Sequence, residues 1–295
     1  MIHERVSPRT LGIVRAVVFT LWACVVGFDS FEELAWLPPS IFQTHGLLAL
    51  LPGGVWSVVL REPFLLGFRA VLVVLLGLAA LGARPYRPIA LLAVLGVLLE
   101  QTLIRGFGFI QHRELALLLA AVVLALFPSA DGFSRWGRED AHAPAPLPSA
   151  ALTLMTLLIL LAYMITGLYR LAYAGPEIFL SNSLRYYIAY TSFRQNYYPF
   201  ELGQVALLYP TAGAVLNAGF VVVTVLEILA PLCLFSRRFR RLWLGVMVPF
   251  HVATLFLMKI FFWQNLVLLV LLLAGVERMR PSRATARATP AVAHP

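Results

Sequence analysis

Three side chains capable of acid–base or hydrogen-bonding chemistry lie in or beside long apolar stretches of the sequence: His112, Arg170 and His251. An ionisable group within a membrane is costly, so it needs either a partner or a function. Histidine can exchange a proton near neutral pH, and arginine can stabilise an anion. Each could also have a purely structural role: packing for His251, an interfacial position for His112 and snorkelling of Arg170 to headgroups.

Three further charged residues end or follow apolar segments. Glu100 and Arg105 close one segment, and Lys259 lies eight residues after His251. We predict that these three side chains line the same site and hold its ligand or cofactor. The sequence has no metal-ligand spacing, so we predict no metal site.

The elements that would position these residues are membrane helices. Hydrophobic residues make up 60% of the chain and charged residues only 13%. A soluble protein of this length could not bury so many consecutive apolar residues, so the bilayer must be the solvent. The net charge of +9 lies mostly beside the apolar runs. That placement is typical of membrane topology and argues against a nucleic-acid partner.

We predict an all-α, polytopic bundle with about eight transmembrane spans. The fourth segment is short for a span of ~17–25 residues. The predicted segments are Leu11–Phe28, Phe64–Leu81, Ile89–Ile104, Leu115–Phe127, Leu152–Leu171, Ala212–Phe235, Leu242–Met258 and Ile260–Val276.

The basic residues also predict the orientation. With the N-terminus inside, the inner connections carry fourteen arginines, and the outer connections carry seven lysines and arginines. Positive charge accumulates on the cytoplasmic side, so this count predicts a cytoplasmic (inner) membrane protein with both termini inside. In this topology the six candidate site residues all belong to the outer half.

The chain divides into a membrane domain, residues 1–277, and a basic tail, residues 278–295, which we predict to be disordered and cytoplasmic. Between two spans, Ser181–Glu201 predicts an interfacial helix. Its aromatic stripe consists of Tyr186, Tyr190, Phe193 and Tyr197. Such a helix could anchor the protein at headgroup level or cover a site.

Two charged residues within the spans need partners of their own. Arg15 lies in the first segment and Glu227 in the sixth, and the topology places both nearer the inner face. We therefore expect them to form a structural ion pair.

Three stretches resemble one known family. Phe109–Asp131 has a histidine, His112, leading a helix that is followed by an aspartate. Tyr163–Leu171 is similar to an aromatic-x-I-A-G-x-x-K-L segment, and Phe250–Leu266 to a late His-led helix with an aromatic turn. These features resemble the vitamin K-dependent gamma-carboxylase-like, or HTTM, membrane proteins. The likeness extends over nearly the whole membrane portion, roughly from Arg9 to Glu277.

The resemblance implies catalytic roles for His112, Arg170 and His251, and a reduced quinone as cofactor. Family chemistry oxidises the quinone and generates a strong base for glutamate carboxylation. Arg170 occupies the position of the family's catalytic lysine. Arginine is a poor general base, so the substitution argues against carboxylase activity. We expect instead a quinone- or lipid-binding site on the outer face.

Two alternatives stay open. The first is a non-catalytic membrane subunit that assists a membrane protein partner, as proteins of the DoxX and MauE type do. The second is a transporter with helices broken near Pro231 and Pro249, although the sequence has no visible internal repeat.

Overall fold

The structure is a computed structural model that describes residues 6–44, 49–50, 52–108, 113–134, 146–194, 199–200 and 202–276. Within these ranges the regular secondary structure is helical and contains no strand. The predicted all-α class is therefore confirmed. His112 and the predicted tail, residues 278–295, lie outside the described residues.

Six helices in the described ranges are long and apolar enough to cross a membrane. They are α1 (Pro8–Phe28, extended by the 3-10 turn η1, Phe31–Trp36), α3 (Glu62–Leu81), α4 (Tyr86–Gly106), α6 (Pro146–Ala174), α10 (Pro210–Ile228) and α11 (Arg237–Met258). This set supports a multi-pass membrane protein.

Two predicted spans are shorter. The fourth segment forms α5 (Leu115–Leu126), and the eighth forms α12 (Trp263–Val270) with a π-helical continuation, η7 (Leu271–Gly275). Both are apolar but fall below the length of an upright span. Each of the eight predicted segments contains a helix, whereas the count of eight spans is not confirmed.

Short helices connect the long ones. They are η2 (Pro39–Ile41), α2 (Gly53–Val59), η4 (Ser129–Asp131), α7 (Glu177–Leu180), α8 (Ser183–Arg194), η5 (Leu202–Gln204), α9 (Val205–Leu208) and η6 (Ala230–Leu234).

Local sequence determines several helix ends. The hydroxyl of Ser7 accepts a hydrogen bond from the backbone N–H of Thr10, and Pro8 follows at the first helical position of α1. Ser236 caps α11 in the same way. Gly82 ends α3 with φ of 70°, a left-handed conformation that glycine adopts without strain.

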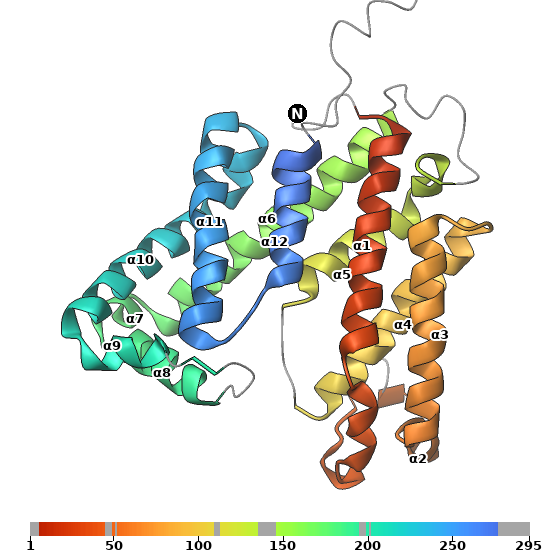
Figure 1. The fold of residues 1–295 in the computed structure, drawn as a ribbon, viewed down its shortest axis with the longest axis horizontal. Coiled ribbons are helices and arrows are strands. Elements are labelled where there is room, and N and C mark those ends of the chain that lie inside the picture. Colours follow the sequence, from red (N-terminus) through yellow and green to blue (C-terminus); the bar gives the residue numbers. More distant parts are fainter. Residues whose placement is uncertain are drawn as a thin grey trace, which may run out of the picture.

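The long helices form two groups joined by α6 (Figure 1). Helices α1, α3, α4 and α5 pack on one another on one side, while α10 and α11 lie on the other. Helix α6 packs against α1 and α5 as well as against α10, and α12 lies between α5 and α11. Residues on α4 are therefore held away from those on α10.

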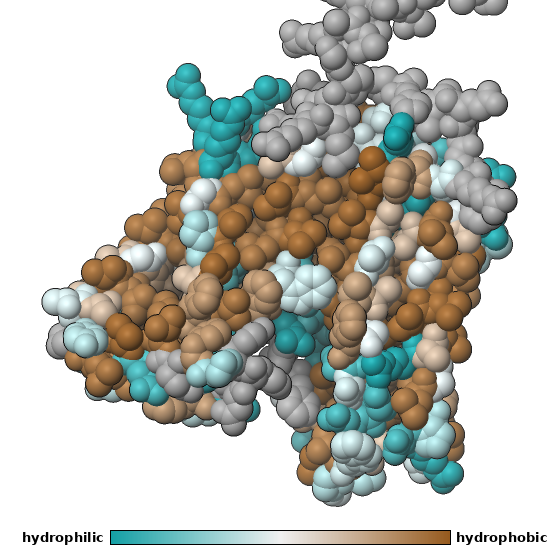
Figure 2. All heavy atoms as spheres, viewed as in Figure 1, coloured by the Kyte–Doolittle hydropathy of each residue, from teal (hydrophilic) through white to brown (hydrophobic). Residues whose placement is uncertain are grey.

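The surface is apolar in the middle and polar toward the ends (Figure 2). Hydrophobic side chains cover the central part of this face, and hydrophilic ones gather above and below it. Val74, Leu95 and Val215 are examples of large apolar side chains that are 60–71% exposed. Such exposure over many helices is unfavourable in water and suits contact with lipid.

The two prolines behave differently from each other. The predicted sixth segment does not continue to Phe235 as one helix, because α10 ends at Ile228 and η6, which contains Pro231, follows. Pro249 lies inside α11 without ending that helix. The structure therefore shows one broken segment where two were considered.

The predicted aromatic helix corresponds to α8. Tyr186, Tyr190 and Phe193 are 56–60% exposed, as expected for an aromatic stripe, and Leu184 and Ile188 are buried on the opposite side. Tyr197 lies outside the described residues. The exposed aromatic face is thus present over the described part of this segment.

Candidate functional site

Polar side chains from three helices meet where α6 crosses α10 and α11. Tyr163, Gly167 and Arg170 are spaced by four and three residues, so they share one face of α6. We call the surrounding set the polar seam, and it consists of Tyr163, Gly167, Arg170, Thr224, Glu227, Trp243 and His251.

Arg170 is held by side chains of α10. It forms an ion pair with Glu227, and its Nη1 donates to the Thr224 hydroxyl at 2.8 Å. Its guanidinium also lies 4.4 Å from the centre of the Phe220 ring. The Arg170 side chain is 17% exposed and the Glu227 side chain 4%. Arg170 is therefore neutralised inside the protein, which adds to its unsuitability as a general base.

This pairing corrects the predicted Arg15–Glu227 bridge. Arg15 is completely buried and donates instead to the backbone carbonyls of Ser129, Gly132, Ala80 and Phe133, at 2.8, 3.4, 3.1 and 2.8 Å. The prediction was wrong because it matched the two charges by their estimated depth along upright helices. In the structure, α6 packs against α10 so that Arg170, and not Arg15, lies beside Glu227.

Gly167 permits the close approach of α6 and α10. A Cβ atom at this position would lie 2.9 Å from Cγ1 of Ile228 and 3.1 Å from Cβ of Glu227. Small residues at helix crossings allow membrane helices to pack closely. The glycine thus brings Glu227 within reach of Arg170, one turn farther along α6.

His251 forms the second half of the seam. Its ring is 5% exposed, and its Nε2 lies 2.8 Å from the Tyr163 hydroxyl. Nδ1 is buried and has no hydrogen-bond partner among the described residues. The rings of Tyr163, Phe250 and Phe262 surround the imidazole at centroid distances of 5.9, 5.4 and 5.4 Å. The histidine therefore occupies an aromatic environment with one polar atom unused.

Trp243 connects the two halves. Its ring meets Tyr163 edge-to-face at 5.3 Å, and its Nε1 donates to the carbonyl of Leu226 at 2.9 Å. Leu226 directly precedes the acidic partner of Arg170. Arg170 and His251 thus belong to one packed region, although each has its own hydrogen-bond partner.

The other predicted site residues have different locations. Glu100 is fully buried in α4, with Oε1 unpartnered among the described residues and Gln101 Nε2 at 3.5 Å from Oε2. Arg105 is half-buried in the last turn of α4. Because α4 packs with α3 and α5, these two residues lie away from the seam (Figure 1).

Lys259 ends the same helix as His251. It is 4% exposed, has φ of 56°, and its backbone N–H closes the last turn of α11 on Leu255. The predicted convergence with His112 falls outside the described residues. Of the six predicted site residues, the structure thus places Arg170 and His251 in one region and Lys259 at the end of α11.

Several residues of this region were not predicted from the sequence. Tyr163 and Thr224 carry the hydroxyls that hold His251 and Arg170. Gln264 and Asn265, which follow Phe262, are 3% and 8% exposed and have unpartnered amide oxygens in the described structure. The four-plus-three spacing from Tyr163 to Arg170 was a usable signal. No comparable periodicity marks the polar pair on the eight-residue α12.

Cysteine and metal chemistry find no support in the described residues. Cys24 and Cys233 are both free. The described part of the chain contains no group of three or more His, Cys, Asp or Glu side chains that could hold a metal ion.

The seam can therefore bind and orient a polar group but offers no activated nucleophile. His251 could donate or accept one further hydrogen bond through Nδ1, and its aromatic neighbours suit a flat apolar molecule. Comparison with protein-family models, curated proteins and solved structures found no match for this chain.

Proposed function

We propose that this chain is a multi-pass protein of the cytoplasmic membrane, with both termini inside, that binds a quinone- or lipid-type ligand beside His251 in the outer half. The family of gamma-carboxylase-like, or HTTM, membrane proteins is part of this proposal and rests on the sequence motifs. The described helices support the membrane location.

The observation that carries the ligand site is the unused Nδ1 of His251. Buried polar atoms nearly always have a partner, so an orphaned one indicates a missing contact. Here the atom is surrounded by aromatic rings, and Tyr163 holds the other ring nitrogen. A ligand oxygen could complete the hydrogen bonding of the imidazole while the ligand ring packs against Phe250 and Phe262.

Carboxylation is not part of the proposed function. A base must be able to lose its proton, and Arg170 is an arginine already paired with Glu227. In this proposal the Arg170–Glu227 pair positions α6 against α10, and Tyr163 on α6 orients His251.

Quinone retention tests the proposal. The parent protein and the His251→Ala and Tyr163→Phe variants would be purified in mild detergent, and bound quinone would be extracted and quantified. We expect the parent to retain quinone and His251→Ala to lose most of it. Tyr86→Phe is a matched control, because Tyr86 is buried and its hydroxyl donates to the carbonyl of Leu124 at 2.9 Å, between α4 and α5 and outside the seam. Equal and negligible retention in all four proteins would refute the ligand site.

A second function, a non-catalytic membrane subunit, is favoured by the completeness of the Arg170 contacts. Glu227, Thr224 and the Phe220 ring satisfy this side chain as a structural ion pair would require. In that case a stoichiometric membrane protein should co-purify, and its amount should not change with His251→Ala. Loss of the partner together with loss of quinone would argue against this second function.

A further inference from the structure

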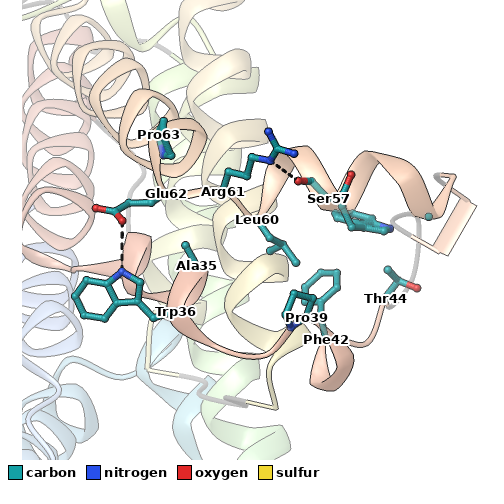
Figure 3. A pocket seen from close by; sticks show the side chains of 12 residues that line it. Ala35, Trp36, Pro39, Phe42, Thr44, Ser57, Leu60, Arg61, Glu62 and Pro63 are labelled. Carbon is teal, nitrogen blue, oxygen red and sulfur yellow. Dashed lines mark hydrogen bonds between the residues drawn. The ribbon is translucent and has the colours of Figure 1, made fainter.

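We propose that the chain holds a phospholipid with a zwitterionic headgroup in a cavity between the segment that follows α1 and the start of α3, separate from the polar seam. The cavity has a volume of about 910 Å³ (Figure 3). Its lining residues are Ala35, Trp36, Pro39, Phe42, Thr44, Gly53, Trp56, Ser57, Leu60, Arg61, Glu62 and Pro63.

The position of the cavity follows from the ends of two membrane-crossing segments. One candidate span ends at Trp36 and the next begins at Glu62. Both residues line the cavity, and Trp36 Nε1 donates to Glu62 Oε2 at 3.4 Å. The end of a span lies at the membrane–water interface, where tryptophan is enriched. The cavity therefore opens at the level of lipid headgroups.

Aromatic and apolar side chains form much of its wall. Phe42 lies 5.1 Å from Trp56 and 5.1 Å from Phe107 between ring centroids. Phe42, Leu60 and Pro39 face the same space in Figure 3. Tryptophan rings attract an ammonium group over their faces. Trp36 and Trp56 thus suit the cationic part of a headgroup.

The rim carries one positive and one negative residue, Arg61 and Glu62, which follow each other in sequence and whose side chains point toward Ser57 and Trp36, respectively (Figure 3). Arg61 uses Nε to donate to the carbonyl of Ser57 at 2.9 Å, while its side chain remains exposed. Glu62 begins α3 and is also exposed. Arginine suits phosphate, and the carboxylate suits an ammonium. This arrangement of charges complements a zwitterionic headgroup and disfavours a purely anionic one, which would meet Glu62.

Apolar surface is available for the rest of the lipid. Phe64 and Leu66, in the first turn and a half of α3, are 40% and 43% exposed. They follow the rim directly toward the membrane interior. Acyl chains could therefore run along α3 while the headgroup stays in the cavity.

Native mass spectrometry of the full chain tests this inference. Phosphatidylethanolamine and phosphatidylglycerol would be titrated separately onto the delipidated protein. We expect phosphatidylethanolamine to bind tighter, and Arg61→Gln or Glu62→Gln to weaken it about tenfold, which corresponds to about 1.4 kcal/mol. Arg87→Gln is the matched control, because Arg87 is an exposed arginine at the start of α4, near the opposite end of α3. Equal affinity for both lipids, or no change in either rim variant, would overturn the proposal.

Two further experiments distinguish binding of a whole lipid from binding of its headgroup alone, and locate the bound lipid on the chain. Soluble glycerophosphoethanolamine should bind at least about tenfold more weakly than the lipid, because it lacks acyl chains. Equal binding would overturn the proposal, since the cavity would then take free headgroups. A photoreactive phosphatidylethanolamine added to the parent protein should crosslink within residues 35–66. Crosslinks found only outside residues 35–66 would overturn the proposal. This experiment uses the parent protein, so it does not depend on whether the variants fold. Neither result depends on quinone retention at His251.

Discussion

Two arginines that lie among apolar helices, the buried Arg15 and the half-buried Arg170, are neutralised in opposite ways. Arg15 lies at the junction of α1, α3 and the turn after α5, and donates to four backbone carbonyls. Arg170 lies between α6 and α10 and is held by the carboxylate of Glu227 and the hydroxyl of Thr224. Both residues are arginines, but backbone carbonyls satisfy Arg15 and side chains satisfy Arg170.

The difference follows from where backbone acceptors are available. The last carbonyls of a helix have no partner within that helix and carry partial negative charge. Ala80 lies in the last turn of α3, and Ser129, Gly132 and Phe133 lie beyond the end of α5. Arg15 can therefore be satisfied without an acid. Near Arg170 the last turn of α10 offers its Leu226 carbonyl to Trp243, and Arg170 is held by two side chains, Glu227 and Thr224.

The largest predicted effect is at Arg15. Arg15→Leu removes four hydrogen bonds from a charged donor and leaves buried carbonyls unpaired, so we expect a loss of more than about 4 kcal/mol of unfolding free energy. The measurement is the yield and unfolding free energy of the protein in lipid–detergent micelles. Arg15→Lys, which keeps the charge but not the planar fork, should recover only part of the loss. A variant with leucine that unfolds like the parent would show that the carbonyl cluster contributes nothing.

Because the partner of Arg170 is a side chain, a second substitution can restore part of the stability that is lost when this partner is changed. Glu227→Gln leaves the half-buried Arg170 without its counterion, and we expect a loss of about 3 kcal/mol. The double variant Arg170→Gln/Glu227→Gln should lose less than the sum of the two single variants in the same unfolding measurement. Additive losses would mean that the pair does not interact. No equivalent rescue is expected at Arg15, because its partners are backbone oxygens.

The glycines beside the two arginines extend the comparison. In Gly82→Ala the new Cβ would lie 2.5 Å from Nη1 of Arg15, in a backbone with φ of 70°. We expect a loss of about 2 kcal/mol, because the backbone is strained and the guanidinium is fixed. Gly167→Ala would crowd Ile228 at 2.9 Å without backbone strain and should cost about 1 kcal/mol. Thermal unfolding of both variants compares their losses of stability. A larger loss in Gly167→Ala than in Gly82→Ala would contradict the inference that the guanidinium of Arg15 is fixed in place.

The smallest effect concerns the tyrosine of the seam. Tyr163→Phe removes one hydrogen bond between membrane helices, and such bonds contribute about 0.6 kcal/mol on average. Stability should therefore change little while the orientation of the His251 ring changes. Imidazole resonances in a histidine-labelled sample report that change, with Tyr86→Phe as the control. A loss as large as that of Glu227→Gln would show that Tyr163 belongs to the ion-pair network.

Much of the fold could be predicted from the sequence. Long apolar runs identify helices because the bilayer requires internally bonded backbone. The end of the sixth helix could not be placed as well, since Pro231 is compatible with either a kink or a stop. The candidate site was predicted only in part. Arg170 and His251 could be selected from the sequence because they are polar residues in apolar segments. The contact of Tyr163 with His251 could not be predicted, because it requires knowing that this face of α6 meets α11.

By itself, the sequence determined which segments are apolar helices and which polar residues need partners, because hydropathy and helix periodicity are local properties. Only the tertiary structure decided which partner each residue has. Pairing depends on helix tilt, on the crossing at Gly167 and on the unbonded carbonyls in the last turn of α3 and beyond α5. Arg15 and Arg170 look alike along the chain, and the difference between them arises from the backbone and side chains that packing brings to each guanidinium.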